Sequence, residues 1–493
     1  MRKAALGSLI ALVTVLAAGA LGWLGLMWWD SRLPGTYNVM DHGQVDLGGG
    51  SVISHAQHGS PLRGVSVAGL HGPRDGKPDA SFTLTAQLAT IELASGRLVQ
   101  ALTYEGRSPG PELRVRQGDL VEVTLENRDI TQGVTIHWHG LDVPNAEDGV
   151  AGVTQDAVSP GERYVYRFRA EQVGTFWYHT HQASSKEVRR GLFGAIVIEP
   201  AAPMQFGLDR VVLAHTFDGI PTLDGNEGID RLDVPAGTRA RLRLVNSDNS
   251  PHRFALTGAP FGVVALDGTD LNGPHELSDT MLEVPGGGRI DVALTVPASP
   301  VWLSLMDTGA ALALNAGQDA VPVVSPALPV FDPTSYGEPV ATPFDASTEF
   351  DRRFELTISE RPGFFNGRPG MHWAINGQIF PHVPTFLVEE GELVEIEISN
   401  ETDAHHPMHL HGHHVLVLSR GDRPVSGSPW WADTLDVGPG ERYRVAFRAD
   451  NPGLWMDHCH NLRHAADGLT MHVAYAGVTT PFDVGGEHDN APE

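Results

Sequence analysis

The sequence predicts an all-β protein in which three β-sandwich domains follow an N-terminal membrane or signal segment. Two observations carry this prediction. One strand unit occurs three times along the chain, and the 493 residues include 56 glycines and 35 prolines, as expected where short strands are joined by many turns. Charged residues make up only 19% of the chain, which argues against extensive disorder.

The N-terminal segment, residues 1–30, has two basic residues followed by an uncharged apolar run over 4–29. This run is long enough to span a bilayer, for which ~20 residues suffice. Two interpretations remain open: an uncleaved anchor, or a signal peptide with its apolar core at 6–17 and a small-residue cleavage site at 18–20. The run continues past that site, which favours the anchor. Because basic residues stay in the cytoplasm, both interpretations predict export, as a membrane-anchored or as a secreted or periplasmic protein.

The repeated unit is a Val-x-x-Gly turn that leads through alternating apolar and polar residues to an asparagine. Its three copies have identical spacing and begin at Val115, Val234 and Val388. A second unit, a glycine-rich turn followed by a strand and later a tryptophan, comes after each copy. Such alternation is typical of a strand with one buried face. We therefore expect three homologous domains near 50–203, 204–340 and 341–480, with a linker over 311–350 and a loose tail after residue 480.

The charge balance limits the partners. With 34 basic and 60 acidic residues, the formal net charge is −26. Binding to nucleic acid needs a basic surface, so we expect no nucleic-acid partner. A cationic substrate is compatible with this charge, although solubility explains it equally well.

Four histidine motifs indicate a metal centre. Residues i and i+2 of a strand point to the same face, so each His-x-His pair can reach one metal or two neighbouring metals. Together the pairs supply eight histidines, too many for one tetrahedral zinc ion. The motifs are His137-Trp138-His139-Gly140, His179-Thr180-His181, His406-Pro407-Met408-His409-Leu410-His411, and His458-Cys459-His460 with His464 beyond.

The only cysteine, Cys459, lies between two of these histidines. On a strand, His458 and His460 share one face and Cys459 points to the other, so the thiolate addresses a different metal from its neighbours. A few covalent bonds then connect two metal sites. The middle domain has no histidine at the equivalent strand, 302–306, so we expect the metal cluster where the first and third domains meet.

Two further histidines complete a set around this cysteine. His406 lies three residues before His409, and Pro407 is expected to bend the chain so that His406 turns away from the cluster. His464 follows Cys459 by five residues. Cys459, His406 and His464 form the His₂Cys set of a blue-copper site.

The sequence from about residue 50 onwards resembles the multicopper oxidases, which include laccases, ascorbate oxidase, bilirubin oxidases and bacterial cuprous oxidases. The patterns HxHG, HxH, HxxHxH and HCHxxxH are complete and in that family's order. The resemblance implies cupredoxin-like Greek-key domains and four copper ions per chain. It also implies that substrate electrons enter at a type 1 copper and reduce O₂ to water at a trinuclear centre. The implied ligands are His406, Cys459 and His464 for type 1, His137 and His409 for type 2, and His139, His179, His181, His411, His458 and His460 for the type 3 pair.

The resemblance also directs attention to residues beside the ligands. The axial type 1 position is Leu469, which cannot bind copper and should raise the potential, while Met471 is a possible substitute ligand. Asp148 matches an acidic position near the trinuclear centre that could supply protons, although it could equally cap a loop. The position after His464, acidic in some relatives, is Ala465 here.

The reducing substrate is less well defined. We expect a small phenolic or aromatic donor, for which Trp430 and Trp431 could line a pocket. The alternative is oxidation of Cu(I), Fe(II) or Mn(II), which the acidic balance and Asp403, close to His406, would suit. A hypothesis of another class is a copper-binding or assembly protein without turnover. The histidine pairs argue against a copper nitrite reductase and a zinc protein.

Overall fold

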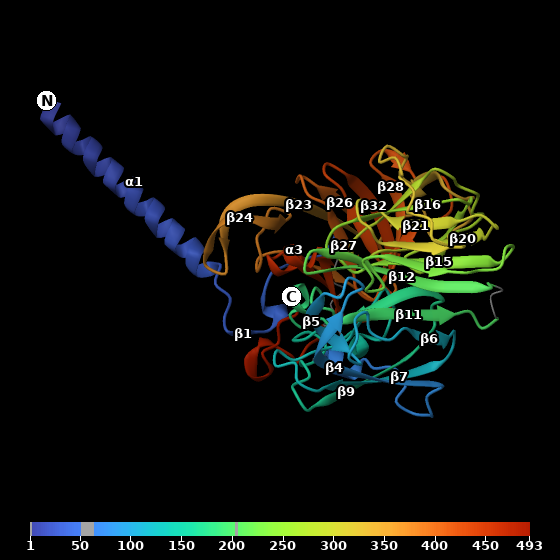
Figure 1. Cartoon of the computed structure of the whole chain (residues 1–493). Helices are drawn as coiled ribbons and strands as arrows, with labels where there is room; N and C mark the ends of the chain where they lie inside the picture. The colour runs from blue at the N-terminus through green and yellow to red at the C-terminus, as the bar shows by residue number, and fades with distance from the viewer. Residues whose placement is uncertain (1, 51–63, 203–205) are drawn as a thin grey trace.

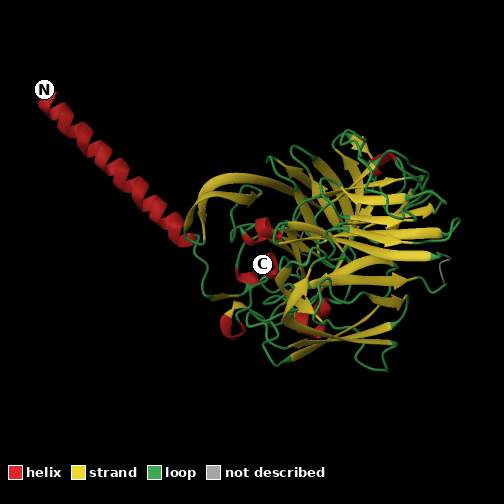
Figure 2. Ribbon diagram, in the orientation of Figure 1, coloured by secondary structure: helices red, strands yellow, loops and turns green. Residues whose placement is uncertain are grey.

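The computed structural model describes residues 2–50, 64–202 and 206–493. The long helix α1 (Arg2–Asp30) projects away from a body that is almost entirely β-structure (Figures 1 and 2). Within it, Ser8–Asp30 has a mean hydropathy of 2.2 and no residue buried against the body, so it is long and apolar enough to cross a membrane. A signal sequence meets the same criterion.

The body contains three pairs of sheets, which confirms the prediction of three β-sandwiches. In the first pair the strand orders are β5-β4-β7-β9 and β6-β11-β10-β8. Their bounds are β4 (Ala80–Glu92), β5 (Leu98–Tyr104), β6 (Leu113–Arg116), β7 (Leu120–Asn127), β8 (His137–His139), β9 (Arg163–Arg169), β10 (Gly174–His179) and β11 (Phe193–Glu199).

The middle pair has the strand orders β13-β12-β15-β20-β17-β18 and β14-β22-β21-β16-β19. Their bounds are β12 (Leu208–Phe217), β13 (Ile220–Leu223), β14 (Ile229–Leu232), β15 (Arg239–Asn246), β16 (His252–Thr257), β17 (Gly262–Leu266), β18 (Thr269–Asp270), β19 (Met281–Val284), β20 (Arg289–Thr295), β21 (Val301–Leu305) and β22 (Ala311–Leu314). Because β22 belongs to a sheet, the expected linker over 311–350 was wrong at its start.

The third pair has the orders β24-β23-β26-β32-β28-β29, with β30 beside β28, and β2-β25-β34-β33-β27-β31. Their bounds are β2 (Gln44–Asp46), β23 (Arg352–Phe365), β24 (Arg368–Ile375), β25 (Pro384–Val388), β26 (Leu393–Asn400), β27 (His406–Leu410), β28 (Val415–Arg420), β29 (Arg423–Pro424), β30 (Trp431–Ala432), β31 (Thr434–Val437), β32 (Arg442–Arg448), β33 (Leu454–Cys459) and β34 (Thr470–Tyr475).

Short elements connect the sheets and the chain ends. β1 (Thr36–Tyr37) pairs with β36 (Val484–Gly485), and β3 (Val65–Ser66) pairs with β35 (Val478–Thr479). Two short helices, α2 (Ser184–Glu187) and α3 (Leu462–Ala466), pack against each other. The short 3-10 helices span Val39–Asp41, Val67–Gly69, Asn145–Glu147, Pro333–Ser335 and Gly486–His488.

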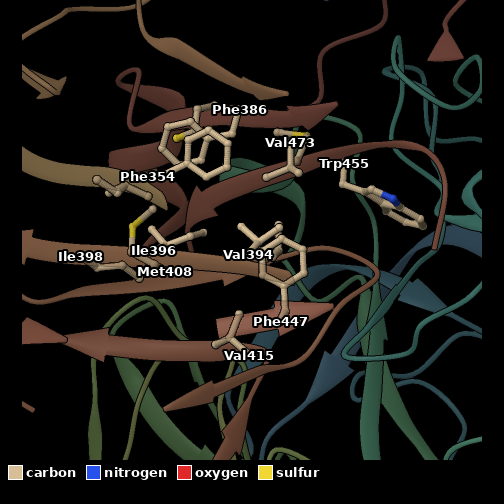
Figure 3. Packing of buried hydrophobic residues seen from close by; sticks show 14 of the residues in the cluster. Phe354, Phe386, Val394, Ile396, Ile398, Met408, Val415, Phe447, Trp455 and Val473 are labelled. Carbon is tan, nitrogen blue, oxygen red and sulfur yellow. The ribbon is translucent and has the colours of Figure 1, made fainter. Parts of the chain in front are cut away.

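Each sandwich has its own apolar core, and the repeated turn explains why the three units look alike in sequence. The glycine of each Val-x-x-Gly turn, at 118, 237 and 391, has a φ of +91°, +86° and +93°, a conformation that glycine adopts without strain. The strand that follows alternates buried and more exposed residues along most of β7, whereas β15 of the middle sandwich is buried at every position after Arg239. In the third sandwich the rings of Phe354 and Phe386 stack with centroids 4.2 Å apart, among the buried side chains of Figure 3.

Candidate metal centre

Eight histidines from the four motifs meet in one buried cluster between the first and third sandwiches. They are His137, His139, His179, His181, His409, His411, His458 and His460, and each is at most 1% exposed. Strand pairing brings them together: β8 lies beside β10 with His137 opposite His179, and β27 lies beside β33 with His409 opposite His458. The two histidines of each His-x-His pair therefore reach a common space, as alternation predicts.

The ring nitrogens of these histidines form three groups. Nε2 of His137 lies 3.4 Å from Nε2 of His409. Nε2 of His458 lies 3.1 Å from that of His411 and 3.5 Å from that of His181. The remaining group contains His139, His179 and His460, with ring centroids 4.7–5.8 Å apart.

Backbone carbonyls fix the tautomers of four of these rings. Nδ1 of His137, His179, His181 and His409 contacts the carbonyl oxygen of Asp148, Thr180, Pro492 and Asp433, respectively, at 2.8–2.9 Å. A carbonyl oxygen only accepts, so each Nδ1 carries the proton and the neutral ring leaves Nε2 with a bare lone pair. Facing lone pairs at these distances repel one another unless a cation lies between them.

The third group also contains ring nitrogens that need a cation, because they lack hydrogen-bond partners. Nδ1 of His139, Nε2 of His179 and Nε2 of His460 are buried and have no hydrogen-bond partner. Burial lowers the pKa of all three rings well below its usual value, and neighbouring imidazoles lower it further. The rings are therefore neutral at pH 7, the form that binds metal ions. The residues present fit a cluster of metal ions better than any arrangement of hydrogen bonds.

A second, smaller group surrounds the cysteine. Sγ of Cys459 lies 3.7 Å from Nδ1 of His406 and 3.7 Å from Nδ1 of His464, and these two nitrogens are 3.2 Å apart. Nε2 of His406 contacts the hydroxyl of Thr402 at 2.8 Å, and Nε2 of His464 contacts the side-chain amide of Asn461 at 3.0 Å. Both Nε2 atoms are thus engaged, and the two Nδ1 atoms converge on the sulfur.

The expected bend at Pro407 was wrong. His406–Leu410 is a continuous strand, β27, with Met408 opposite Cys459. His406 and His409 are three positions apart, so strand alternation alone sends them to opposite faces. No departure from strand geometry is needed to reach two different sites.

The surroundings of the cysteine group are apolar and aromatic. Trp373, on β24, contacts both histidines, with ring centroids 5.0 Å from His406 and 4.5 Å from His464. Leu469 and Met471 are fully buried in the same core as Cys459. The ligand role suggested for Met471 stays a prediction.

Carboxylates contact the histidine cluster from two sides. The buried side chain of Asp148 lies 3.1 Å from Nδ1 of His137 and 3.1 Å from Nδ1 of His411, so this residue is at the cluster. Asp433, which sequence reasoning missed, lies 3.2 Å from Nε2 of His139. No motif marks this aspartate, although it shortly follows the tryptophan pair singled out in the sequence.

Asp433 is held by an arginine from the middle sandwich. Both terminal nitrogens of Arg289 donate to the two carboxylate oxygens, and neither side chain is more than 1% exposed. Burial alone would raise the pKa of Asp433, but the guanidinium of Arg289 lowers it well below its usual value. The middle sandwich, which carries no candidate ligand, thus helps to form the centre.

The C-terminal segment was expected to be loose, and this was wrong. Asn490 is 3% exposed, and its side-chain oxygen accepts a hydrogen bond from the backbone of Ala157. The carbonyl oxygen of Pro492 accepts from His181, and Oε1 of Glu493 lies 3.1 Å from Nδ1 of His458. The polar composition of this segment gave no sign of these contacts, because they depend on partners far away in the chain.

The remaining candidates lie outside both groups. His252, in the middle sandwich, pairs with Asp248 at 2.7 Å and is in no potential metal group among the described residues. Asp403 is exposed. Trp430 packs between the cores of the second and third sandwiches, and Trp431 pairs with β28.

Comparisons with known proteins agree with this geometry. Residues 85–203 and 352–477 match the multicopper oxidase family. A crystal structure of a multi-copper oxidase from Pseudomonas thermotolerans is 30% identical, with a TM-score of 0.67 over 81% of this chain and 100% of that one. The multicopper oxidase MmcO of Mycobacterium tuberculosis is 28% identical over 83% of this chain and 90% of its own length.

Relatives with different named activities are about equally similar to this chain. Laccase-1 of Botryotinia fuckeliana is 25% identical, over 80% of this chain and 82% of its own length. The iron transport multicopper oxidase FET3 of Kluyveromyces lactis is 26% identical, over 75% of this chain and 72% of its own length. The neighbours share the three-domain cupredoxin-like fold, which confirms the predicted fold class.

Proposed function

Because the chain belongs to the multicopper oxidase family, we propose that it oxidises a small phenolic or aromatic donor and reduces O₂ to water. The observation that carries this proposal is the pairing of two kinds of site. One buried cysteine sulfur converges with two imidazoles, and the residues on either side of that cysteine belong to the eight-histidine cluster.

We propose four copper ions per chain, distributed as the nitrogen groups suggest. A type 1 copper would take Cys459, His406 and His464, and a type 2 copper would take His137 and His409. The two type 3 coppers would each take three of the remaining histidines. One set would be His181, His411 and His458, and the other His139, His179 and His460. When bound, copper supplies reversible one-electron chemistry at the thiolate site and four-electron reduction of O₂ at the cluster.

The protein's own groups hold this arrangement in place. Cys459 is joined through the backbone to both His458 and His460, so electrons received at one site have a short covalent route to the other. The backbone oxygen of Asp148 accepts a hydrogen bond from Nδ1 of His137 and its carboxylate accepts one from Nδ1 of His411, which orients both rings. Its carboxylate oxygens are also well placed to hold a proton beside the cluster. Burial excludes bulk water from the histidine cluster, whereas His464 at the cysteine site is partly exposed.

The same geometry bears on the substrate. Trp373 lies against both type 1 histidines and offers an aromatic surface to an aromatic donor. A metal-ion substrate is the second candidate, because Glu283, Asp436 and Glu441 line a cavity of about 160 Å³ together with His405, the residue before His406. Two of these carboxylates are already engaged: Asp436 pairs with His405 at 2.7 Å, and Glu441 pairs with Arg420. The aromatic donor is therefore the better supported.

Oxygen uptake by the copper-loaded protein tests this function. A phenol, a non-phenolic dye, Cu(I), Fe(II) and Mn(II) are supplied in turn at matched concentrations. We expect uptake with the phenol and the dye to exceed uptake with the metal ions. Much faster turnover of a metal ion would transfer the proposal to a metallo-oxidase, and no uptake with any donor would leave a copper-binding protein without turnover.

Replacing Glu493 with alanine should weaken copper retention. The change removes the carboxylate beside Nδ1 of His458, and loss of such a supporting contact lowers metal affinity by roughly 10- to 100-fold. Copper remaining after dialysis against a graded series of chelator concentrations is the measurement. Glu493→Gln keeps an acceptor oxygen and should restore retention, while Glu487→Ala, at an exposed site in the same segment, should behave like the unaltered protein. Equal retention by Glu493→Ala would refute the supporting role.

We also propose that α1 remains as an anchor and that the catalytic body lies outside the cytoplasm. The apolar part of the helix is not buried by the body, which it meets only near its end where Trp28 lies beside Gly367, as expected of a segment whose surroundings are lipid.

A further inference from the structure

A cavity of about 520 Å³ lies on the side of the body from which α1 departs. Its wall includes the aromatic side chains Tyr37, Phe365 and Phe380. The volume lies within the ~300–1,000 Å³ range of sites for small organic ligands, which are mostly apolar with a few polar groups that fix orientation. Size and lining therefore suit an aromatic molecule.

Three polar atoms of residues that line this cavity make no hydrogen bond: Oγ1 of Thr470, Nε2 of His472 and Oε1 of Glu493, the last of which lies 3.1 Å from Nδ1 of His458. Thr470 and His472 supply the two neutral groups. Thr470 and His472 are two residues apart on β34 and point to the same face, where both line the cavity. Thr470 is 7% exposed and His472 is 8% exposed. Oγ1 of Thr470 and Nε2 of His472 make no hydrogen bond. Because an unmade buried hydrogen bond is costly, a ligand that bonds to both atoms would bind favourably.

The cavity adjoins the proposed type 1 site. Ala465, Ala466 and Gly468 form part of its wall, and Ala465 directly follows His464. The backbone oxygen of Leu469 accepts a hydrogen bond from the backbone of Cys459, at 3.1 Å. A molecule in the cavity is thus separated from the cysteine group by the loop that carries His464.

The opposite wall belongs to the chain that leaves the helix. Leu33, Pro34 and Gly35 line the cavity and follow the end of α1 at Asp30 by three to five residues. An extended residue spans at most ~3.6 Å, so this wall lies within roughly 18 Å of the helix end. Figure 1 shows α1 leaving from the side on which the β23–β24 hairpin, α3 and the C-terminus lie.

The hairpin is tied to the same junction. The backbone of Gly367 donates to the hydroxyl of Ser31 at 3.1 Å, and the side-chain oxygen of Asn366 accepts from the backbone of Leu33 at 3.3 Å. These bonds fix the hairpin tip, which also lines the cavity, against the base of the helix. With α1 in a bilayer, the cavity lies close to the headgroups.

From these observations we propose that the cavity binds a membrane-dissolved hydroquinone as the electron donor, with its ring hydroxyls bonded to Thr470 and His472. This inference rests on the proposed function and on the anchor. Each hydroquinone gives up two electrons and two protons and leaves as a quinone. Two hydroquinones therefore balance the reduction of one O₂ to two waters.

Binding of decylbenzoquinone, the oxidised form of a tailed hydroquinone, tests the site without turnover. The full-length, copper-loaded protein in detergent micelles is titrated calorimetrically. Thr470→Val and His472→Phe keep the side-chain shape but remove one hydrogen bond each, and each should raise Kd about tenfold. The matched control is Thr257→Val, which removes another unpartnered threonine hydroxyl in the middle sandwich and should leave Kd unchanged. Copper content and melting temperature identify any variant that fails to fold.

Three outcomes would overturn the proposal: no binding, the same Kd in all four proteins, or a Kd raised equally by the control. A comparison of oxidation in lipid vesicles identifies the source of the donor. The decyl hydroquinone should have a KM at least tenfold below that of the tail-less compound, and equal values would exclude the membrane source. Oxygen uptake with the soluble dye is measured in parallel. Uptake with the dye but no quinone binding refutes this site alone, whereas no uptake with any donor refutes the proposed function.

Discussion

Replacing Cys459 with serine should abolish the blue colour of the copper-loaded protein and lower the rate of donor oxidation at least ~1000-fold, equivalent to about 4 kcal/mol in the activation free energy. Serine has nearly the same shape, but its hydroxyl is not a thiolate and cannot supply the soft ligand of a blue-copper site. The eight-histidine cluster lies on the other face of β33, so its copper should remain. The loss would therefore affect electron entry and not the binding of metal at the cluster.

The visible absorption spectrum and oxygen uptake with an aromatic donor measure this effect. A suitable control is Val473→Thr, which introduces a hydroxyl into the same buried core on the neighbouring strand. It should reduce stability but leave the colour intact. Retention of most of the activity by Cys459→Ser would refute the route from the cysteine to its neighbouring histidines.

Replacing Arg289 with methionine should destabilise the protein by about 3–5 kcal/mol, because the buried carboxylate of Asp433 would lose the guanidinium that binds both of its oxygens. His414, whose Nε2 lies 3.3 Å from Asp433, replaces only part of that interaction. The effect should extend beyond the middle sandwich. The side chain of Arg289 also donates to the backbone oxygen of Thr175 on β10, so it connects all three sandwiches at the metal centre. Asp433 in turn contacts His139, so copper retention should fall as well.

Urea denaturation of the variants measures this stability loss. The double variant Arg289→Met with Asp433→Asn should be less destabilised than Arg289→Met alone, because it removes the buried charge that has lost its guanidinium partner. Arg253→Met provides the matched control. This arginine pairs with Glu283 at the surface, where its side chain is 51% exposed, and its loss should cost no more than about 1 kcal/mol. Equal costs for Arg289→Met and Arg253→Met would contradict the structural role of the buried pair.

Cys459 and Arg289 differ in how far the sequence alone could predict their roles. The strand repeat identified the three sandwiches because a turn that needs glycine and a strand with one buried face leave a periodic pattern. The histidine motifs predicted the cluster for the same reason: alternation within a short strand converts spacing directly into direction. The structure brings all eight cluster histidines together and places the other two beside Cys459.

Contacts between distant segments could not be predicted in this way. Arg289 and Asp433 are 144 residues apart. Asp433 belongs to no motif, and Arg289 ends the glycine-rich turn of the second repeated unit, a position that gives no sign of its partner. Glu493 reaches His458 only because the C-terminal segment folds back over the first sandwich, and its composition favoured a loose tail. The bend expected at Pro407 was wrong for a related reason. His406 and His409 are three positions apart, so alternation along a straight strand already turns them to opposite faces.

The copper content of the fully loaded protein tests the central claim most directly. Elemental analysis combined with protein quantification should give four copper ions per chain for the unaltered protein and three for Cys459→Ser. A value far below four for the unaltered protein, or the same value for both, would contradict the division of these side chains into one cysteine site and one histidine cluster.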